Sequence, residues 1–180
     1  GLDDFTTYTG QAGQIDILST PDSSADLTGV SFANWHTFAF TDDTTANTVT
    51  VDADNLANIT NFRGDTNTDV VTGDLASADL SGRDLTGIDE FRSTNTGSVV
   101  ITTDQGAVDD LTTISASMAS SATLTTGAAS LDVSGLILTD FDTLETTAGG
   151  GTTLTISSAQ AGTLTNVTGA AGTDTLTVLG

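Results

Sequence analysis

The chain has 180 residues, of which 24 are acidic and three are basic, giving a formal net charge of −21 at pH 7. It has no cysteine and one histidine, which excludes disulfide bonds, cysteine-ligated zinc and histidine-rich metal sites. The negative charge argues against nucleic-acid partners, and no stretch approaches the ~20 apolar residues that membrane insertion requires.

Short runs that alternate threonine with an aliphatic residue predict half-buried strands. In chain order they lie at 47–51, 98–102, 123–125, 152–156 and 175–178. Gly, Asp, Asn and Ser between these runs predict turns. No helical apolar spacing is sustained over the roughly 12 residues that a stable helix needs. We therefore expect at most one helical turn each at 54–59, 106–111 and 158–164.

The sequence also repeats itself with a period of 52 to 53 residues. Segments 25–29, 78–82 and 131–135 read Ala-Asp-Leu-Thr-Gly, Ala-Asp-Leu-Ser-Gly and Leu-Asp-Val-Ser-Gly, at steps of 53. The period predicts four parts: residues 1–24 as the C-terminal part of a preceding repeat, then repeats at 25–77, 78–130 and 131–180. We expect these parts to form one continuous piece of a longer array.

The two ends of the chain also match each other. Tyr8 falls on Val167, and Ile17 falls on Leu176, at an offset of 159, which is three times 53. We therefore expect the chain to start and stop in the middle of a repeat.

A repeat of this length is too short for an immunoglobulin-like sandwich, which takes about 100 residues. It suits two or three coils of a β-solenoid, at roughly 17 to 26 residues per coil. We predict an all-β chain that forms a right-handed parallel β-solenoid, or β-helix. Equivalent apolar residues are expected to stack over one another as its core: Leu27, Phe32, Trp35, Phe38, Leu80, Leu85, Ile88, Phe91, Val133, Leu138, Phe141 and Leu144.

One stretch carries a local resemblance to a known repeat. Residues 78–87, Ala-Asp-Leu-Ser-Gly-Arg-Asp-Leu-Thr-Gly, resemble two consecutive pentapeptide repeats, the A-D/N-L-x-x motif of a right-handed quadrilateral β-helix. About ten residues per unit match, which supports a solenoid turn.

A second stretch concerns metal binding. Residues 169–177 resemble the RTX nonapeptide G-G-x-G-x-D-x-U-x, and 64–72 is a weaker match. The resemblance implies calcium held by carboxylates and turn carbonyls. It makes Asp65, Asn67, Asp69 and Asp174 candidate calcium ligands. The alternative is that these residues only form turns.

Aspartates recur at the same period. Asp26, Asp79 and Asp132 are equivalent, and so are Asp89 and Asp142. Such columns would form either a cation ladder or an acidic, sugar-binding groove. We favour a different interpretation, in which these aspartates are turn residues whose side chains hydrogen-bond to their own backbone. The residues that break the repeat form no catalytic triad, so we predict no enzymatic activity.

As a whole, the unit resembles the Thr-, Gly- and Asp-rich repeats of large secreted bacterial surface proteins, such as RTX-type adhesins, S-layer proteins and extracellular filament proteins. The resemblance implies a secreted, cell-surface structural protein that self-associates end to end or laterally and is stabilised by cations such as Ca²⁺. One alternative is a β-helix that binds or degrades cell-surface polysaccharide. A lesser one is an ice-binding solenoid, which needs its Thr-x-Thr pairs on one side: Thr48/Thr50, Thr123/Thr125, Thr153/Thr155, Thr163/Thr165 and Thr175/Thr177.

Overall fold

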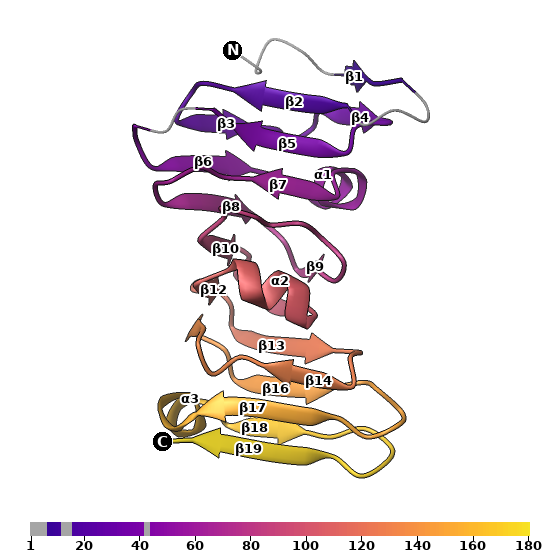
Figure 1. Ribbon diagram of the computed structural model, residues 1–180, viewed down its shortest axis with the longest axis vertical. Coiled ribbons are helices and arrows are strands. Elements are labelled where there is room, and N and C mark those ends of the chain that lie inside the picture. Colours follow the sequence, from indigo (N-terminus) through magenta and orange to yellow (C-terminus); the bar gives the residue numbers. More distant parts are fainter. Residues whose placement is uncertain (1–6, 12–15, 42–43) are drawn as a thin grey trace.

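The computed structural model describes residues 7–11, 16–41 and 44–180 (Figure 1). Strands make up 43% of the structure, and all the strand pairs among the described residues are parallel. Three helices of six residues each lie where single helical turns are predicted. The coarser part of the fold prediction, a mostly β chain with parallel sheets, is confirmed.

Strands that pair with each other lie one circuit apart along the chain. Ile17 pairs with Thr37, for example, and Thr37 pairs with Asn61. The chain thus returns to the same side of the molecule one level further along its long axis (Figure 1). These offsets lie within the range of roughly 17 to 26 residues expected for one coil.

Side 1 of the stack carries one sheet of six strands, followed by a helix. In order along the stack, its elements are β3 (Ser24–Asp26), β6 (Asn47–Thr50), β8 (Asp69–Gly73), β10 (Glu90–Ser93), β12 (Thr113–Ser115), β15 (Ile137–Thr139) and α3 (Ser158–Thr163). The side-chain amide of Gln160 fixes α3 there, because it donates to the carbonyl oxygens of Val133 (2.6 Å) and Leu136 (3.0 Å), just before β15.

Side 2 carries two sheets with a helix between them. Its elements are β1 (Thr7–Thr9), β4 (Ser31–Ala33), α1 (Ala53–Asn58), β9 (Ser77–Asp79), β11 (Ser98–Thr102), β13 (Ser121–Thr126), β16 (Thr143–Thr146) and β18 (Asn166–Thr168). The helix contacts both β4 and β9. It therefore occupies the place of one strand.

Side 3 is interrupted in the same way, at its middle. Its elements are β2 (Ile17–Thr20), β5 (Thr37–Phe40), β7 (Asn61–Arg63), α2 (Gln105–Asp110), β14 (Ser130–Asp132), β17 (Thr153–Ser157) and β19 (Thr175–Leu179). Between β7 and α2, the connection is the isolated parallel bridge of Asn61 with Asp84. The Asp110 carboxylate of α2 then accepts the Leu85 N–H at 3.1 Å.

The three helices begin at side-chain caps that can be read from the sequence. Asp52 caps α1, and Ser157 caps α3, each accepting a hydrogen bond from the third helical N–H. Asn55 and Gln160 complete the two capping boxes by bonding back to the N-cap backbone. Asp104 caps α2 without a reciprocal bond.

The repeat and the stack have different periods. One level of the stack is one circuit of the three sides and uses three segments. One repeat comprises seven segments, such as β3, β4, β5, β6, α1, β7 and β8. Seven segments make two levels plus one side, so each repeat begins one side further round. The helices show this directly, because α1, α2 and α3 lie on sides 2, 3 and 1.

Equivalent residues therefore do not stack, and that part of the prediction is wrong. Phe38, Phe91 and Leu144 lie in β5, β10 and β16, on three different sides. Phe91 instead pairs with Val71 and Ile114. The expected column of Trp35, Ile88 and Phe141 is absent for the same reason. Two strands stack when the chain between them makes one circuit of the three sides. One repeat is not a whole number of such circuits, so equivalent residues fall on different sides.

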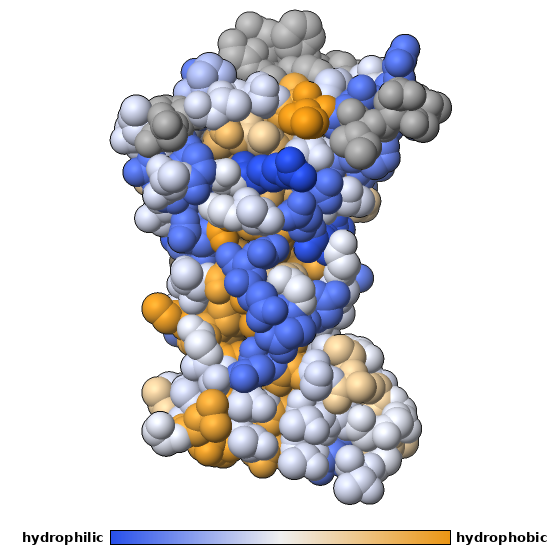
Figure 2. Space-filling model, in the orientation of Figure 1, coloured by the Kyte–Doolittle hydropathy of each residue, from blue (hydrophilic) through white to orange (hydrophobic). Residues whose placement is uncertain are grey.

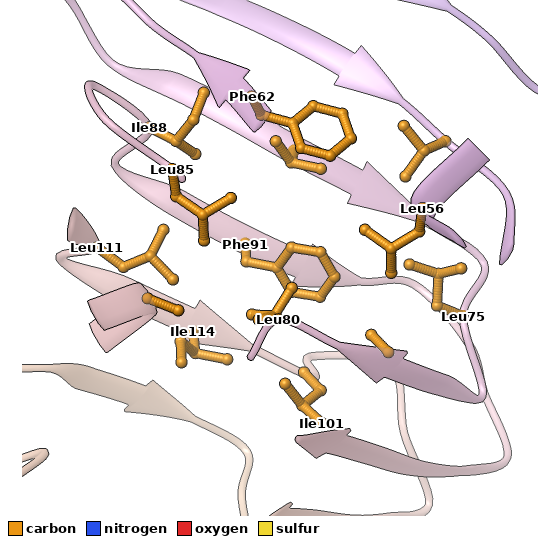
Figure 3. Close-up of a cluster of buried hydrophobic side chains, with 14 of the residues drawn as sticks. Leu56, Phe62, Leu75, Leu80, Leu85, Ile88, Phe91, Ile101, Leu111 and Ile114 are labelled. Carbon is orange, nitrogen blue, oxygen red and sulfur yellow. The ribbon is translucent and has the colours of Figure 1, made fainter. Parts of the chain in front are cut away.

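The core is nevertheless continuous along the molecule. Of the twelve predicted core residues, ten are at most 6% exposed, while Trp35 and Leu138 are partly buried against the same core. Figure 3 shows Phe62 and Phe91 on successive levels, pointing into one interior with Leu80 and Ile101. Each fully buried apolar side chain contributes roughly 1.5–3 kcal/mol. The stack is stabilised by this shared interior.

Candidate functional site

Three of the four candidate calcium ligands lie together at the start of β8. The Asp69 side chain is fully buried. Its Oδ1 accepts a hydrogen bond from the Asn47 amide (2.7 Å), and its Oδ2 accepts the Asp65 N–H (2.5 Å). The same amide reaches Asp65 Oδ2 at 3.0 Å. Asp65 Oδ1 accepts the Asn67 N–H at 2.8 Å. The cluster therefore closes the turn from Gly64 to Asp69.

Burial raises the pKa of the Asp69 carboxyl above its usual 3.8. The hydrogen bonds from the Asp65 N–H and from Asn47 oppose this rise, and the negative charges of Asp65 and Asp89 add to it. The backbone N–H of Asp69 donates to Asp89 Oδ2 at 2.9 Å. Three carboxylates thus converge on one turn, held by amide donors.

The fourth candidate ligand, Asp174, lies elsewhere. It precedes β19 on side 3, where its Oδ1 accepts the Thr152 N–H at 2.7 Å. Among the described residues, no group of three or more His, Cys, Asp and Glu side chains is arranged to hold a metal ion. The carboxylate oxygens of Asp65 and Asp69 face N–H donors, which is the arrangement of turn formers. Calcium binding at these residues stays a prediction.

The equivalent aspartates form turns with their own backbone. The Oδ1 atoms of Asp26, Asp79 and Asp132 accept the N–H two residues later, at 3.0, 2.9 and 2.9 Å respectively. This is the behaviour expected of turn residues. Because the three lie in β3, β9 and β14, on three different sides, they form neither a cation ladder nor a shared groove.

A second set of aspartates bonds between levels, which the sequence analysis missed. Asp52 and Asp104 cap their helices and also accept the N–H groups of Gly29 (2.7 Å) and Gly82 (2.8 Å). Asp142 accepts the Ala122 N–H at 2.9 Å, as Asp89 does for Asp69. The capping signature Asp52-x-x-Asn55 is readable in the sequence. The hydrogen bonds between levels are not readable in the sequence, because they depend on how many residues make up one circuit.

Two shallow hollows lie beside helices, at repeat-related positions. One, of about 330 Å³, lies between α1 and β9 and includes Leu56, Asp79 and Arg83. The other, of about 360 Å³, lies between α2 and the turn after β14 and includes Gln105, Asp109, Asp132, Ser134 and Leu136.

The first hollow differs from the second because Arg83 stands where the second has Leu136. The Nε of Arg83 donates to the Asp79 carbonyl, and its Nη1 donates to the Ile59 carbonyl, both at 2.6 Å. The arginine thus fastens the end of α1 to the turn after β9.

On the face that Figure 2 shows, hydrophobic residues are visible between hydrophilic ones at the narrow middle of the molecule. Within the described residues, no helix has the length and apolar character needed to cross a membrane.

The threonine pairs do not share one side. Thr153 and Thr155 pair with Thr175 and Thr177 on side 3. Thr48 and Thr50 lie in β6 on side 1, and the pair at 123 and 125 lies in β13 on side 2. The condition stated for ice binding is therefore not met by these strands.

No protein-family model, no curated protein and no solved structure matched the chain.

Proposed function

We propose that the chain is a non-catalytic, structural segment of a right-handed β-solenoid that serves as a stiff rod in a secreted bacterial surface protein. The observation that carries the proposal is the series of parallel strand pairs, each one circuit apart, around one continuous core. A fold in which every level supports the next resists bending and suits a spacer, lattice or stalk.

The polar side chains support a structural role as well. The aspartates that sequence analysis singled out hold turns, cap helices or connect levels. The hollows beside α1 and α2 are shallow and lie where a helix replaces a strand. In these contacts the aspartate carboxylates accept hydrogen bonds from backbone N–H groups, which stabilises the fold.

The charge supports an environment rich in cations. Two of the three arginines form ion pairs, Arg63 with Asp84 (3.4 Å) and Arg92 with Glu90 (2.7 Å). A net charge of −21 remains after all three arginines are counted. Salt or millimolar calcium, as found outside cells, would screen the remaining repulsion within roughly 10 Å or less. The charge therefore supports our proposal of a cell-surface location.

Small-angle X-ray scattering of the 180-residue chain tests the rod. At about 4.8 Å per level, the seven to eight levels predict a stack roughly 35–40 Å long, and a tandem of two chains should be about twice as long. Scattering from two jointed globules would contradict the proposal. So would turnover of acidic polysaccharides by the purified chain.

One observation favours a second candidate, carbohydrate binding. The hollow beside α2 presents Gln105, Asp109 and Ser134 together, and hydroxyl and carboxylate groups hydrogen-bond sugars. Calorimetry with acidic polysaccharides tests this, with Asp109→Ala as the variant and Asp54→Ala, at an exposed position of α1, as the control. Equal heats for both variants and the unaltered chain would remove the hollow from consideration.

A further inference from the structure

Arg83 breaks the repeat, because a charged side chain stands where the other two repeats have an apolar one. Its equivalents are Val30 and Leu136, which are buried at 7% and 6% exposure. In all three repeats the backbone N–H of this residue donates to the carbonyl oxygen three residues before it, at 3.0, 3.1 and 2.9 Å. The turn itself therefore forms without a charge, and the arginine needs a separate explanation.

The guanidinium of Arg83 is a partly buried cation without an ion pair. Arg63 and Arg92 form ion pairs with carboxylates, whereas Arg83 forms none with a described residue. Its Nε and Nη1 donate to two backbone carbonyl oxygens. The N–H groups of its Nη2 have no hydrogen-bond partner among the described residues. An arginine has five N–H donors, so donors remain for a ligand.

The charge of Arg83 is incompletely compensated within the chain. Burial lowers the pKa of its guanidinium below the usual value, and the negative charge of Asp79 opposes this effect. The Asp79 carboxylate is engaged elsewhere, since its Oδ1 accepts the Ser81 N–H at 2.9 Å. A buried charge without a partner is unfavourable, and an anion that binds from outside would remove this cost.

Arg83 lines the hollow of about 330 Å³ beside α1, which also has an apolar wall and two further polar groups. Ala53, Leu56 and Ala57 of α1 form the wall, and Ser77 and Asp79 of β9 supply a hydroxyl and a carboxylate. A mostly apolar concave surface with a few polar groups is the usual composition of a small-ligand site. Its size is at the lower end of the range for such sites, about 300–1,000 Å³.

The hollow beside α2 has the same framework without the cation. Leu136 takes the place of Arg83, and Asp109 and Asp132 both line the surface. An anion would be repelled there, whereas the hollow beside α1 offers it a guanidinium. The chain thus contains a site and a repeat-related control.

We propose that the hollow beside α1 binds a uronic acid unit of an acidic polysaccharide, with the sugar carboxylate on the guanidinium of Arg83. The planar N–H groups of an arginine match the two oxygens of a carboxylate. Ser77 and Asp79 are placed to bond to the sugar hydroxyl groups, and the apolar face of the sugar ring packs on α1. This inference goes beyond the proposed structural role and does not depend on it.

Nuclear magnetic resonance tests the contact directly, because three arginines give three Nε–H signals. Trigalacturonate is added to the nitrogen-15-labelled chain in about 0.15 M salt, which screens the net negative charge. The signal of Arg83 is expected to shift with the sugar concentration, while the signals of the ion-paired Arg63 and Arg92 stay in place. No shift of Arg83, or equal shifts of all three signals, would overturn the proposal.

Calorimetry with the same sugar tests the location, with two variants that each add one negative charge. Ala57 is an exposed residue of α1 that lines the hollow, so Ala57→Glu is expected to fold and to weaken binding about tenfold or more. Thr96 is exposed between β10 and β11, and Thr96→Glu is expected to change the Kd by less than about twofold. Equal losses in both variants would mean that general repulsion, and not the hollow, controls binding.

The methyl ester of trigalacturonate tests the need for the carboxylate. The ester keeps the sugar ring but removes the charge, so it is expected to bind about tenfold more weakly. An ester that binds as tightly as the acid contradicts the role of Arg83. A loss of binding in Asp109→Ala, without one in Ala57→Glu, would assign the sugar to the hollow beside α2 and refute the proposal. The scattering test of the rod is independent of all these results.

Discussion

Gly64 and Gly87 touch each other across successive levels of the stack. A Cβ added to Gly64 would lie 2.6 Å from the carbonyl carbon of Gly87, and one added to Gly87 would lie 2.9 Å from that of Gly64. The Gly64 N–H donates to the Thr86 carbonyl at 3.0 Å, which holds the two backbones together. Gly87 also has a positive φ of 79°, which favours glycine.

Gly64→Ala is therefore expected to lower the free energy of unfolding by about 1–3 kcal/mol, because the new methyl group meets backbone atoms that cannot move aside. Urea denaturation followed by circular dichroism measures the change. Gly135→Ala is the matched control, since no atom lies within 4 Å of its added Cβ, and a change within about 0.5 kcal/mol is expected. Equal effects at both positions would contradict the backbone contact.

Phe91→Ala is expected to cost about 3–5 kcal/mol, because Phe91 is fully buried between Val71 and Ile114 in the middle of the long sheet. Ile137→Ala on the same side is the control. Its side chain is 63% exposed, so the loss should stay within about 0.5 kcal/mol. Thermal unfolding of both variants measures the difference, and a small loss for Phe91→Ala would show that the continuous core is loosely packed.

Arg83→Ala is expected to lower stability by about 1.5–3 kcal/mol, because it removes two charge-assisted hydrogen bonds to the carbonyl oxygens of Ile59 and Asp79. Arg83→Lys should recover only part of the loss, because an ammonium group lacks the planar fork. Arg92→Ala removes a half-buried ion pair in which two guanidinium nitrogens bond to Glu90, and it should cost about 1 kcal/mol. The order of the three urea midpoints checks this account.

The contributions of Asp69 and Asp84 to stability are expected to change with pH on opposite sides of the ordinary carboxyl pKa of 3.8. Burial raises the pKa of Asp69, so its contribution to stability is present below 3.8 and is lost as the pH rises through its folded value. A hydrogen bond from the Thr86 hydroxyl lowers the pKa of Asp84, helped by the Thr86 N–H and Arg63 and opposed by burial. That contribution is present above 3.8 and is lost as the pH falls.

Two variants separate these effects in urea titrations at several pH values. Asp69→Asn should flatten the change of stability above pH 3.8, and Asp84→Asn should flatten the change below it. Identical pH profiles for the two variants would mean that the general repulsion among the 24 acidic residues dominates both limbs.

Melting temperature is expected to rise with sodium chloride, since salt shortens the range of repulsion from about 10 Å at 0.1 M to about 3 Å at 1 M. If calcium binds as the nonapeptide resemblance implies, it should add a further rise at matched ionic strength that magnesium does not reproduce and that a chelator reverses. Equal curves for calcium and magnesium would reduce the role of cations to screening.

Much of the fold could be predicted from the sequence because strands and caps are local. The alternation of threonine with aliphatic residues located strands such as β11 and β17, and the short segments after them located α1, α2 and α3. Leu80 and Val133 were assigned to the core from the period alone, and both are fully buried. Asp79 and Asp132 were favoured as turn residues, and each bonds to its own backbone.

What could not be predicted depends on the length of chain in one level. The repeat length says which positions are equivalent, but only the circuit of three sides says which positions meet. Ile17 illustrates the difference: it was aligned with Leu176, yet Ile17 pairs with Thr37, whereas Leu176 pairs with Leu154. The contacts of Asn47 with Asp65 and Asp69 were missed for the same reason.

The turn of one side per repeat has a consequence for how such proteins change length. If recombination removed a single repeat from an array, everything beyond the junction would swing by a third of a revolution, and a ligand-binding patch there would point in a new direction. Removing three repeats together would shorten the array and preserve the azimuth of every patch. Insertions and deletions that leave function intact should therefore come in multiples of three.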